Sequence, residues 1–160
     1  MKYPLIPNDE QKALLKREFQ KLTKIKVHID SLASRMVESK RFDNVSVVLG
    51  DKLSEFCRVS GYEFDTSVTR MIEFASGTVL ACRKSKRSYA KSGLQYAPAI
   101  IRLANSETGN SFTRSAHLVS LEGLGTDWYR YQSDGKFVNQ RVQYAQVYRH
   151  NDDLYDIEFM

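Results

Sequence analysis

Residues 8–39, NDEQKALLKREFQKLTKIKVHIDSLASRMVES, decide the first half of the fold. The stretch begins with Asn8, Asp9 and Glu10, which favour a helix N-terminus, and the chain then has neither glycine nor proline until Gly50. When successive residues are placed about 100° apart, the large apolar side chains occupy one wedge of about 140°. They are Leu14, Leu15, Phe19, Leu22, Ile25, Ile29, Leu32, Ala33, Met36 and Val37. We therefore predict one long helix that ends near Ser39.

The predicted helix is longer than the expected diameter of the protein. It would run about 46 Å, whereas a compact chain of this size is about 40 Å across. We expect it to overhang, to pack against another chain, or to break near His28, where Val27 and Ile29 are β-branched. Seven of its apolar residues repeat at an average of about 3.5 residues, which favours a homodimer through this helix, with packing on a sheet as the alternative. They are Leu15, Phe19, Leu22, Ile25, Ile29, Leu32 and Met36.

Two shorter helices are expected after it. Asp51 can cap a helix over residues 51–60, and Gly61 follows where a left-handed C-terminal residue is wanted. Asp65 and Gly77 bracket the next helix in the same way. Its apolar residues have the i, i+3, i+4, i+7 spacing of a helix that buries one face.

Past Gly77 the apolar period changes to two, which predicts strands. The expected strands cover residues 78–82, 96–104, 112–121, 128–132, 137–148 and 154–159. Asp134 and Gly135 form a tight hairpin turn, residues 149–153 form another, and Gly123 and Gly125 lie in a loop. Helices followed by a run of strands indicate an α+β fold with a mainly antiparallel sheet of five or six strands. We expect a single domain over residues 1–160, with a core that joins helices to sheet and includes Phe19, Leu22, Ile29, Val68, Ile72, Ile157 and Phe159.

Composition limits the class of protein. The chain has 160 residues, of which 42% are hydrophobic, and no apolar run approaches the length of a membrane span. Pro4 and Pro7 stand where a signal peptide would have its apolar run. Cys57 and Cys82 are too few and too far apart for a disulfide framework, which fits a reducing compartment. We expect a cytoplasmic protein with two free thiols and no membrane partner.

Charge is unevenly distributed along the chain. Lys and Arg number 24 against 19 Asp and Glu, so the net charge is +5. Residues 1–40 hold nine basic and five acidic side chains, and residues 81–100 hold five basic side chains and no acidic one. These two segments carry more than the whole net charge. Polyanions are therefore natural partners.

The common catalytic and cofactor signatures are absent from the sequence. There is no G-x-S-x-G, GxxxxGK[ST], G-x-G-x-x-G, H-E-x-x-H or C-x-x-C motif. No histidine has metal-ligand spacing to another histidine or to a cysteine. We predict no catalytic residue, metal or cofactor. An enzyme assembled from scattered residues remains a third hypothesis, with Arg102, Arg114, His117 and Tyr129 as its candidates.

Two basic features point to a function. The first is a ridge on the long helix, opposite its apolar wedge, made of Arg17, Lys21, Lys24, His28 and Arg35. Its simpler interpretation is an ordinary solvated helix face. The alternative interpretation is a surface that contacts phosphates.

The second feature is an open loop over residues 83–93. Its five cations are Arg83, Lys84, Lys86, Arg87 and Lys91. Arginine forks and lysines suit phosphate oxygens, serines add hydrogen bonds, and Tyr89 can stack on an exposed base. A solvated loop that aids solubility is the alternative.

These features lead to one hypothesis and one alternative. The leading hypothesis is a small basic protein that contacts a DNA or RNA backbone through the loop and the ridge, with little base readout. The alternative is an interaction or inhibitor module that docks on an acidic protein, through the same basic surface or through the aromatic C-terminal sheet.

Overall fold

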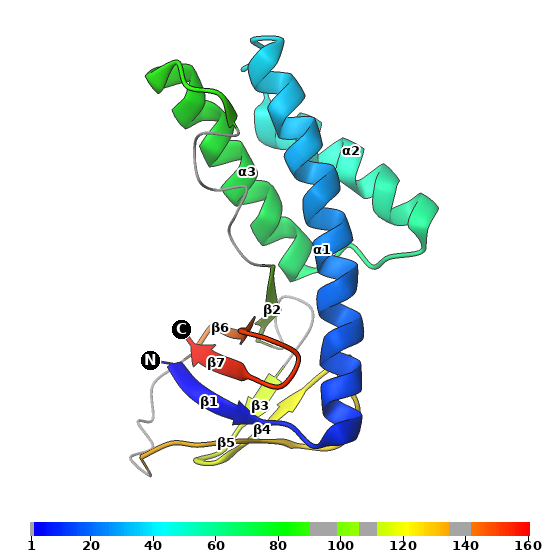
Figure 1. Cartoon of the computed structure of the whole chain (residues 1–160), viewed down its shortest axis with the longest axis vertical. Coiled ribbons are helices and arrows are strands. Elements are labelled where there is room, and N and C mark those ends of the chain that lie inside the picture. Colours follow the sequence, from blue (N-terminus) through cyan, green and yellow to red (C-terminus); the bar gives the residue numbers. More distant parts are fainter. Residues whose placement is uncertain (1, 90–98, 106–111, 135–141) are drawn as a thin grey trace. The chain divides into compact units, whose positions relative to one another are not determined.

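The computed structural model describes residues 2–89, 99–105, 112–134 and 142–160. It confirms the predicted α+β fold, with three helices and one seven-stranded antiparallel sheet, slightly more strands than expected (Figure 1). In chain order the elements are β1 (Lys2–Ile6), α1 (Asp9–Glu38), α2 (Val45–Ser60), α3 (Thr66–Ser85), β2 (Ile100–Ala104), β3 (Phe112–Arg114), β4 (Leu118–Leu121), β5 (Tyr129–Tyr131), β6 (Tyr144–Arg149) and β7 (Tyr155–Phe159).

The chain divides into two compact units. Residues 1–20 and 99–160 form the first, which we call the sheet unit, and residues 21–98 form the second, which we call the helical unit. The helix α1 contributes its first part to the sheet unit and its remainder to the helical unit, and it is continuous through His28, so the expected break is not found. That residues 1–160 fold as a single domain stays a prediction.

The sheet has the strand order β2-β6-β7-β1-β5-β4-β3, so the N-terminal strand β1 lies near its middle. Sequence reasoning missed β1 because Pro4 lies inside it, and proline is rare in central strands. The carbonyl of Pro4 accepts from Gln132 of the β5 side at 2.9 Å, so its ring nitrogen faces that side too. The β1–β5 ladder pairs begin one residue later, at Leu5 and Tyr131, so the missing N–H lies at the end of this ladder.

The start of α1 is fixed by a reciprocal capping arrangement. The Asn8 side chain accepts from the Gln11 amide at 2.8 Å, and the Gln11 side chain accepts from the Asn8 amide at 2.9 Å. The Gln11 Nε2 also donates to the Trp128 carbonyl at 3.1 Å. One buried glutamine therefore joins the helix start to the entry of β5.

The sheet unit has its core where α1 covers the sheet. Leu15 and Phe19 of α1 are buried, and the Phe19 ring lies against the Tyr155 ring with centroids 6.0 Å apart. In the loop between β4 and β5, Gly125 has a φ of +95°, and a Cβ there would lie 2.9 Å from Leu14 Cδ1. The expected loop at Gly123 and Gly125 is confirmed, and this close approach explains why the second position is glycine.

The helix α2 begins earlier than predicted. Asn44, in the left-handed region with φ 50°, is its N-cap residue, whereas Asp51 lies inside the helix, so the predicted cap at Asp51 is wrong. A buried face that repeats every four residues from Val45 extends the helix upstream past Gly50. The predicted end is confirmed, since Gly61 is left-handed with φ 73°.

The helix α3 ends later than predicted. Asp65 is its N-cap, as expected, and its side chain accepts from the Val68 amide at 3.1 Å. Gly77 does not end the helix, and residues 78–82 are helical, so the strand expected there is wrong. The physical reason is one continuous buried helical face, which comprises Val68, Ile72, Ala75, Val79 and Cys82.

The remaining strands follow the prediction with shifted ends. The strand expected over residues 112–121 is two strands, β3 and β4, joined by a turn in which the Ser115 amide donates to the Leu118 carbonyl at 2.8 Å. The turn between β6 and β7 is confirmed. The turn at Gly135 and the outer parts of two expected strands, residues 96–98 and 137–141, lie outside the described residues.

Burial agrees with most of the expected core. Of its seven predicted members only Phe159 is half-buried, and the other six are buried. Six of the seven residues of the predicted dimer seam are also buried within the chain, all except Leu32, so packing inside the protein covers most of that face. Self-association through α1 stays a prediction. In the part of the chain that the structure describes, no helix combines the length and the apolar character of a membrane span.

Candidate functional site

The predicted basic loop is in part the end of α3. Arg83 and Lys84 belong to its last turn, Lys86 is its C-cap residue in the left-handed region with φ 56°, and Arg87 follows. All four side chains are exposed. The expectation of an open loop from residue 83 is therefore wrong for the first three residues, because the buried face of α3 continues to Cys82. Lys91 lies outside the described residues.

Tyr89 does not have the role that the sequence suggested. It is only 2% exposed, and its hydroxyl donates to Asp30 Oδ1 at 2.6 Å. Asp30 Oδ2 also lies 2.6 Å from Lys26 Nζ. Burial, followed by the hydrogen bond to Asp30, raises the pKa of Tyr89. A buried ring cannot stack on a base, so Tyr89 instead anchors the segment that follows α3 to α1.

The ridge on α1 is not one free surface. Lys21 Nζ lies 3.7 Å from Asp65 Oδ2, with side chains only 17% and 7% exposed. The His28 ring stacks on the Phe56 ring of α2 with centroids 4.0 Å apart. Burial, and then the charge of Arg35, lower the pKa of His28. The centre of the ridge therefore serves packing inside the helical unit.

Arg17 and Lys24, also predicted as phosphate ligands, are exposed on α1. Arg17 belongs to the sheet unit and Lys24 to the helical unit. With Lys21 between them engaged by Asp65, they form no continuous row of free cations.

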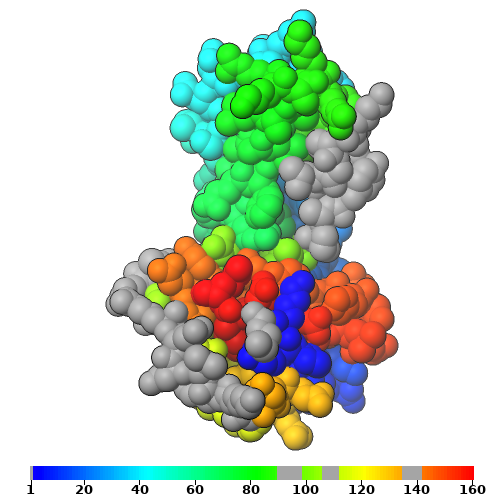
Figure 2. Space-filling model, turned by 90° about the vertical axis from the view of Figure 1, so that its left-hand side faces the viewer, coloured from blue at the N-terminus to red at the C-terminus, as the bar shows by residue number. Residues whose placement is uncertain are grey.

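The end of α3 lies beside other basic residues that the sequence analysis did not select. The Arg83 guanidinium lies 5.7 Å from the centroid of the Phe42 ring, which belongs to the α1–α2 connection. Figures 1 and 2 show the end of α1 and the end of α3 at the same end of the helical unit. This shared region, which we call the basic end, contains Arg35, Lys40, Arg41, Arg83, Lys84, Lys86 and Arg87.

The cations of the basic end differ from others in the protein. Elsewhere Lys12, Lys26, Arg58 and Arg149 each lie within ion-pair distance of a carboxylate. Within residues 2–89 and the other described segments, none of the seven cations of the basic end makes an ion pair. Residues 35–43 and 83–87, which include these seven cations, hold two acidic residues, Glu38 and Asp43. The basic end thus has a positive charge that the described chain does not neutralise.

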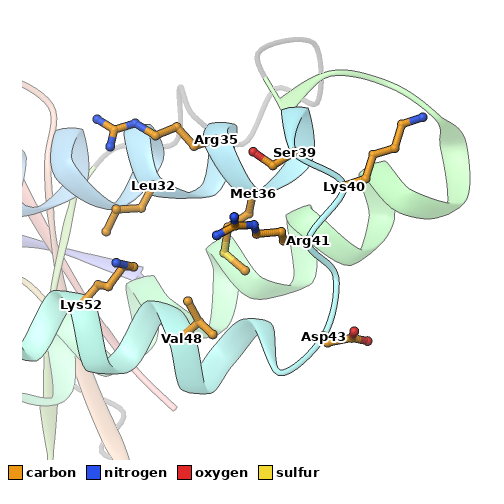
Figure 3. A pocket seen from close by; sticks show the side chains of 9 residues that line it. All are labelled: Leu32, Arg35, Met36, Ser39, Lys40, Arg41, Asp43, Val48 and Lys52. Atoms are coloured by element: carbon orange, nitrogen blue, oxygen red, sulfur yellow. The ribbon is translucent and has the colours of Figure 1, made fainter.

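A cleft of about 560 Å³ opens at the basic end between α1, the α1–α2 connection and α2. Its lining consists of Leu32, Arg35, Met36, Ser39, Lys40, Arg41, Asp43, Val48 and Lys52. Figure 3 shows Arg41 and Lys52 extending into the space between the helices, whereas Arg35 and Lys40 extend away from α2 at the rim. The cleft therefore combines apolar walls with cationic groups.

The residues of the enzyme hypothesis have structural contacts in the sheet unit. The Tyr129 hydroxyl is buried and donates to the Leu124 carbonyl at 2.7 Å, and burial raises the pKa of Tyr129. The Arg102 guanidinium lies 3.7 Å from the Tyr144 ring centroid, and that of Arg114 lies 4.8 Å from the Phe159 centroid. The exposed His117 has its Nδ1 3.2 Å from Ser133 Oγ. Among the described residues, no group of three or more His, Cys, Asp and Glu side chains could hold a metal ion.

In comparisons with known proteins, no protein-family model matches the chain and no curated protein sequence matches it significantly.

Proposed function

We propose that this protein binds the phosphate backbone of nucleic acid through the basic end, with little readout of base sequence. The observation that supports this most is the gathering of seven exposed or rim cations, from two segments more than forty residues apart, without ion-pair partners in the described chain. Phosphates supply the missing negative charge, and the four arginines can each bind two phosphate oxygens.

The positions of the cations on the protein fit an interaction that does not depend on the base sequence of the nucleic acid. The cations extend from helix ends and from a connection. Among the described residues 35–43 and 83–87 the one aromatic side chain is the half-buried Phe42, which lies against Arg83. Contacts to phosphates set affinity and orientation but carry no base information. Two buried free thiols, Cys57 and Cys82, whose pKa values burial raises, fit a protein that acts in the reducing cytoplasm.

The experiment is a titration of a labelled duplex at several salt concentrations, followed by fluorescence anisotropy. Each phosphate contact contributes a slope of about −0.9 to the dependence of log affinity on log salt. Changing Arg83, Lys84, Lys86 and Arg87 to serine should make the slope shallower by up to about 3.6. Affinity should fall almost equally for unrelated sequences.

A matched pair of double variants removes two charges from the basic end in one case and two charges from the sheet unit in the other. Lys84→Ser with Arg87→Ser should make the slope shallower by about 1.8. Lys16→Ser with Arg130→Ser removes the same charge from exposed positions of the sheet unit and should change the slope much less. An unchanged slope in the first variant, or no binding by the wild type at low salt, would end the nucleic-acid proposal in favour of an acidic protein partner.

A further inference from the structure

The cleft at the basic end has a lining that backbone binding does not explain. A duplex backbone needs only exposed cations, yet this hollow has Leu32, Met36 and Val48 on its walls and Arg41 and Lys52 extending into it (Figure 3). Its volume of about 560 Å³ is within the roughly 300–1,000 Å³ of pockets that take small ligands. Four cations and one carboxylate, Asp43, line it, so its ligand should be anionic.

The hollow continues along α1 and α2. A second depression of about 490 Å³ shares Leu32 and Lys52 with the cleft and is also lined by His28, Phe56, Val59 and two carboxylates, Asp51 and Glu55. The stacked rings of His28 and Phe56 thus form part of the same groove. The cationic groups are concentrated in the cleft, which is therefore where an anionic ligand would lie.

We propose that the cleft takes an unpaired nucleotide, so that the protein prefers single-stranded over double-stranded nucleic acid; this inference rests on the proposed function. A nucleotide has the two properties that the lining requires, an anionic phosphate and a base with apolar faces. The base lies against Met36 and Val48 and under the planar guanidinium of Arg41, since arginine planes stack on bases. The phosphates lie on Lys52 and on Arg35 and Lys40 at the rim.

The preference follows from what the duplex makes inaccessible. In a duplex the bases are paired and stacked, and turning one outward costs a few kcal/mol. In an unpaired strand the base is already accessible, so binding does not include this free-energy cost. The preference should therefore depend on the cleft walls, whereas the salt dependence should depend on the number of cations.

The test compares a short single-stranded oligonucleotide with its duplex, as DNA and as RNA, by anisotropy at fixed salt. Val48→Gln places a longer polar side chain in the cleft without changing charge, and it should weaken single-strand binding about fivefold, the lower end of what stacking one base contributes. Its duplex affinity and salt slope should stay unchanged. The matched control is Val47→Gln, because Val47 is the neighbouring residue of α2, is 60% exposed and lies outside the cleft lining.

A second pair of variants tests the guanidinium plane and does not depend on filling the cleft. Arg41→Lys keeps the charge but loses the plane, and it should weaken single-strand binding more than duplex binding. Arg87→Lys should affect the two forms equally. Thermal unfolding of each variant verifies that it is folded.

The outcomes separate this inference from the proposed function. If the wild type binds both forms equally and Val48→Gln behaves like Val47→Gln, the cleft proposal is wrong while backbone binding stands. If neither form binds at low salt, the proposed function fails. If an acidic peptide binds and Val48→Gln weakens it, whereas oligonucleotides do not bind, the cleft belongs to a protein ligand and the proposal is overturned.

Discussion

The two ends of α3 are built in opposite ways. At its start, Asp65 accepts from the Val68 amide, lies 3.7 Å from Lys21, and is almost completely buried. At its end, Lys86 has a φ of 56°, a conformation that glycine usually adopts at helix ends, and the cations around it are exposed. The start combines cap, charge pair and burial, each of which stabilises the fold. Stability alone would not favour a lysine in this left-handed conformation, whereas Arg83 and Lys84 in the last turn interact favourably with the helix dipole.

The same contrast holds for backbone conformation. The non-glycine residues with positive φ in the described segments are Lys40, Asn44 and Lys86. All three lie at or next to the basic end, at the ends of α1 and α3 and at the start of α2. Left-handed non-glycine residues cost about 1 kcal/mol each. The buried cap and ion pair of α3 lie at its start, and its exposed positive charge lies at its end. Variants can therefore test the two ends independently.

The largest effect is expected at the start of α3. Asp65→Ala removes the N-cap acceptor and leaves Lys21, 17% exposed, without this ion pair. We expect urea unfolding to show that the free energy of unfolding falls by about 2 to 3 kcal/mol, because both the cap and the ion pair of Asp65 with a partly buried lysine are lost. Asp65→Asn keeps a capping oxygen and should lose less. Glu63→Ala, at an exposed position before the helix, should lose almost nothing; an equal loss in all three variants would contradict this account.

Tyr89→Phe should have the second largest effect. It removes the hydrogen bond of 2.6 Å to Asp30 and leaves the charges of the basic end in place. We expect a loss of about 1 to 2 kcal/mol in thermal or urea unfolding, since the acceptor is a carboxylate. The salt slope of nucleic-acid binding should stay unchanged. Tyr62→Phe is the control in the same unit; if it destabilised the protein as much, the Tyr89 anchor would be in doubt.

The sequence predicted those parts of the fold that depend on local pattern. The apolar wedge of α1, the Asp65 cap and the Gly61 end are each specified within a few residues, and each is confirmed. The errors occur where packing decides. The period of two past Gly77 predicted a strand over residues 78–82, but Thr78 and Val79 are buried on α3. No strand was predicted over residues 2–6, where Pro4 lies at a ladder end.

The candidate site was predictable only in part. The sequence predicted Arg83, Lys84, Lys86 and Arg87 as site residues, because these four and Lys91 form a group of five cations without an acidic residue. Lys40 and Arg41 lie more than forty residues away, and only the packing of the α1–α2 connection against Arg83 brings them to the same end. Tyr89 was misjudged because its partner, Asp30, is 59 residues distant.

A smaller effect of opposite sign is expected at the end of α3. Lys86→Gly should stabilise the protein by up to about 1 kcal/mol, because glycine adopts the left-handed conformation without steric cost. Lys84→Gly removes the same charge from the last turn of α3 and should destabilise the protein by up to about 1 kcal/mol. Both should make the salt slope of binding to a duplex shallower by about 0.9. A stabilised Lys86→Gly with an unchanged slope would show that the lysine contributes nothing to binding.

The smallest effect concerns His28. It lies on the predicted basic ridge but, like Asp65 at the start of α3, it contributes to packing and stability. Burial against Phe56, and then the charge of Arg35, lower the pKa of its imidazole below the usual 6.5, so the folded state favours the neutral ring.

The sign of the pH dependence follows from this shift. Between the folded and the unfolded pKa the unfolded state binds more protons, so the contribution of His28 to stability is complete above about pH 6.5 and is lost as the pH falls through the folded pKa. Urea unfolding at pH values from neutral to about 5 should therefore show a steeper loss for the wild type than for His28→Gln. Arg35→Gln should raise the pKa of His28 towards its usual value, which NMR titration of the ring can measure directly. A pKa above 6.5 in the wild type would mean that the ring is not held neutral by packing, and the centre of the ridge would return to the surface that is available to phosphates.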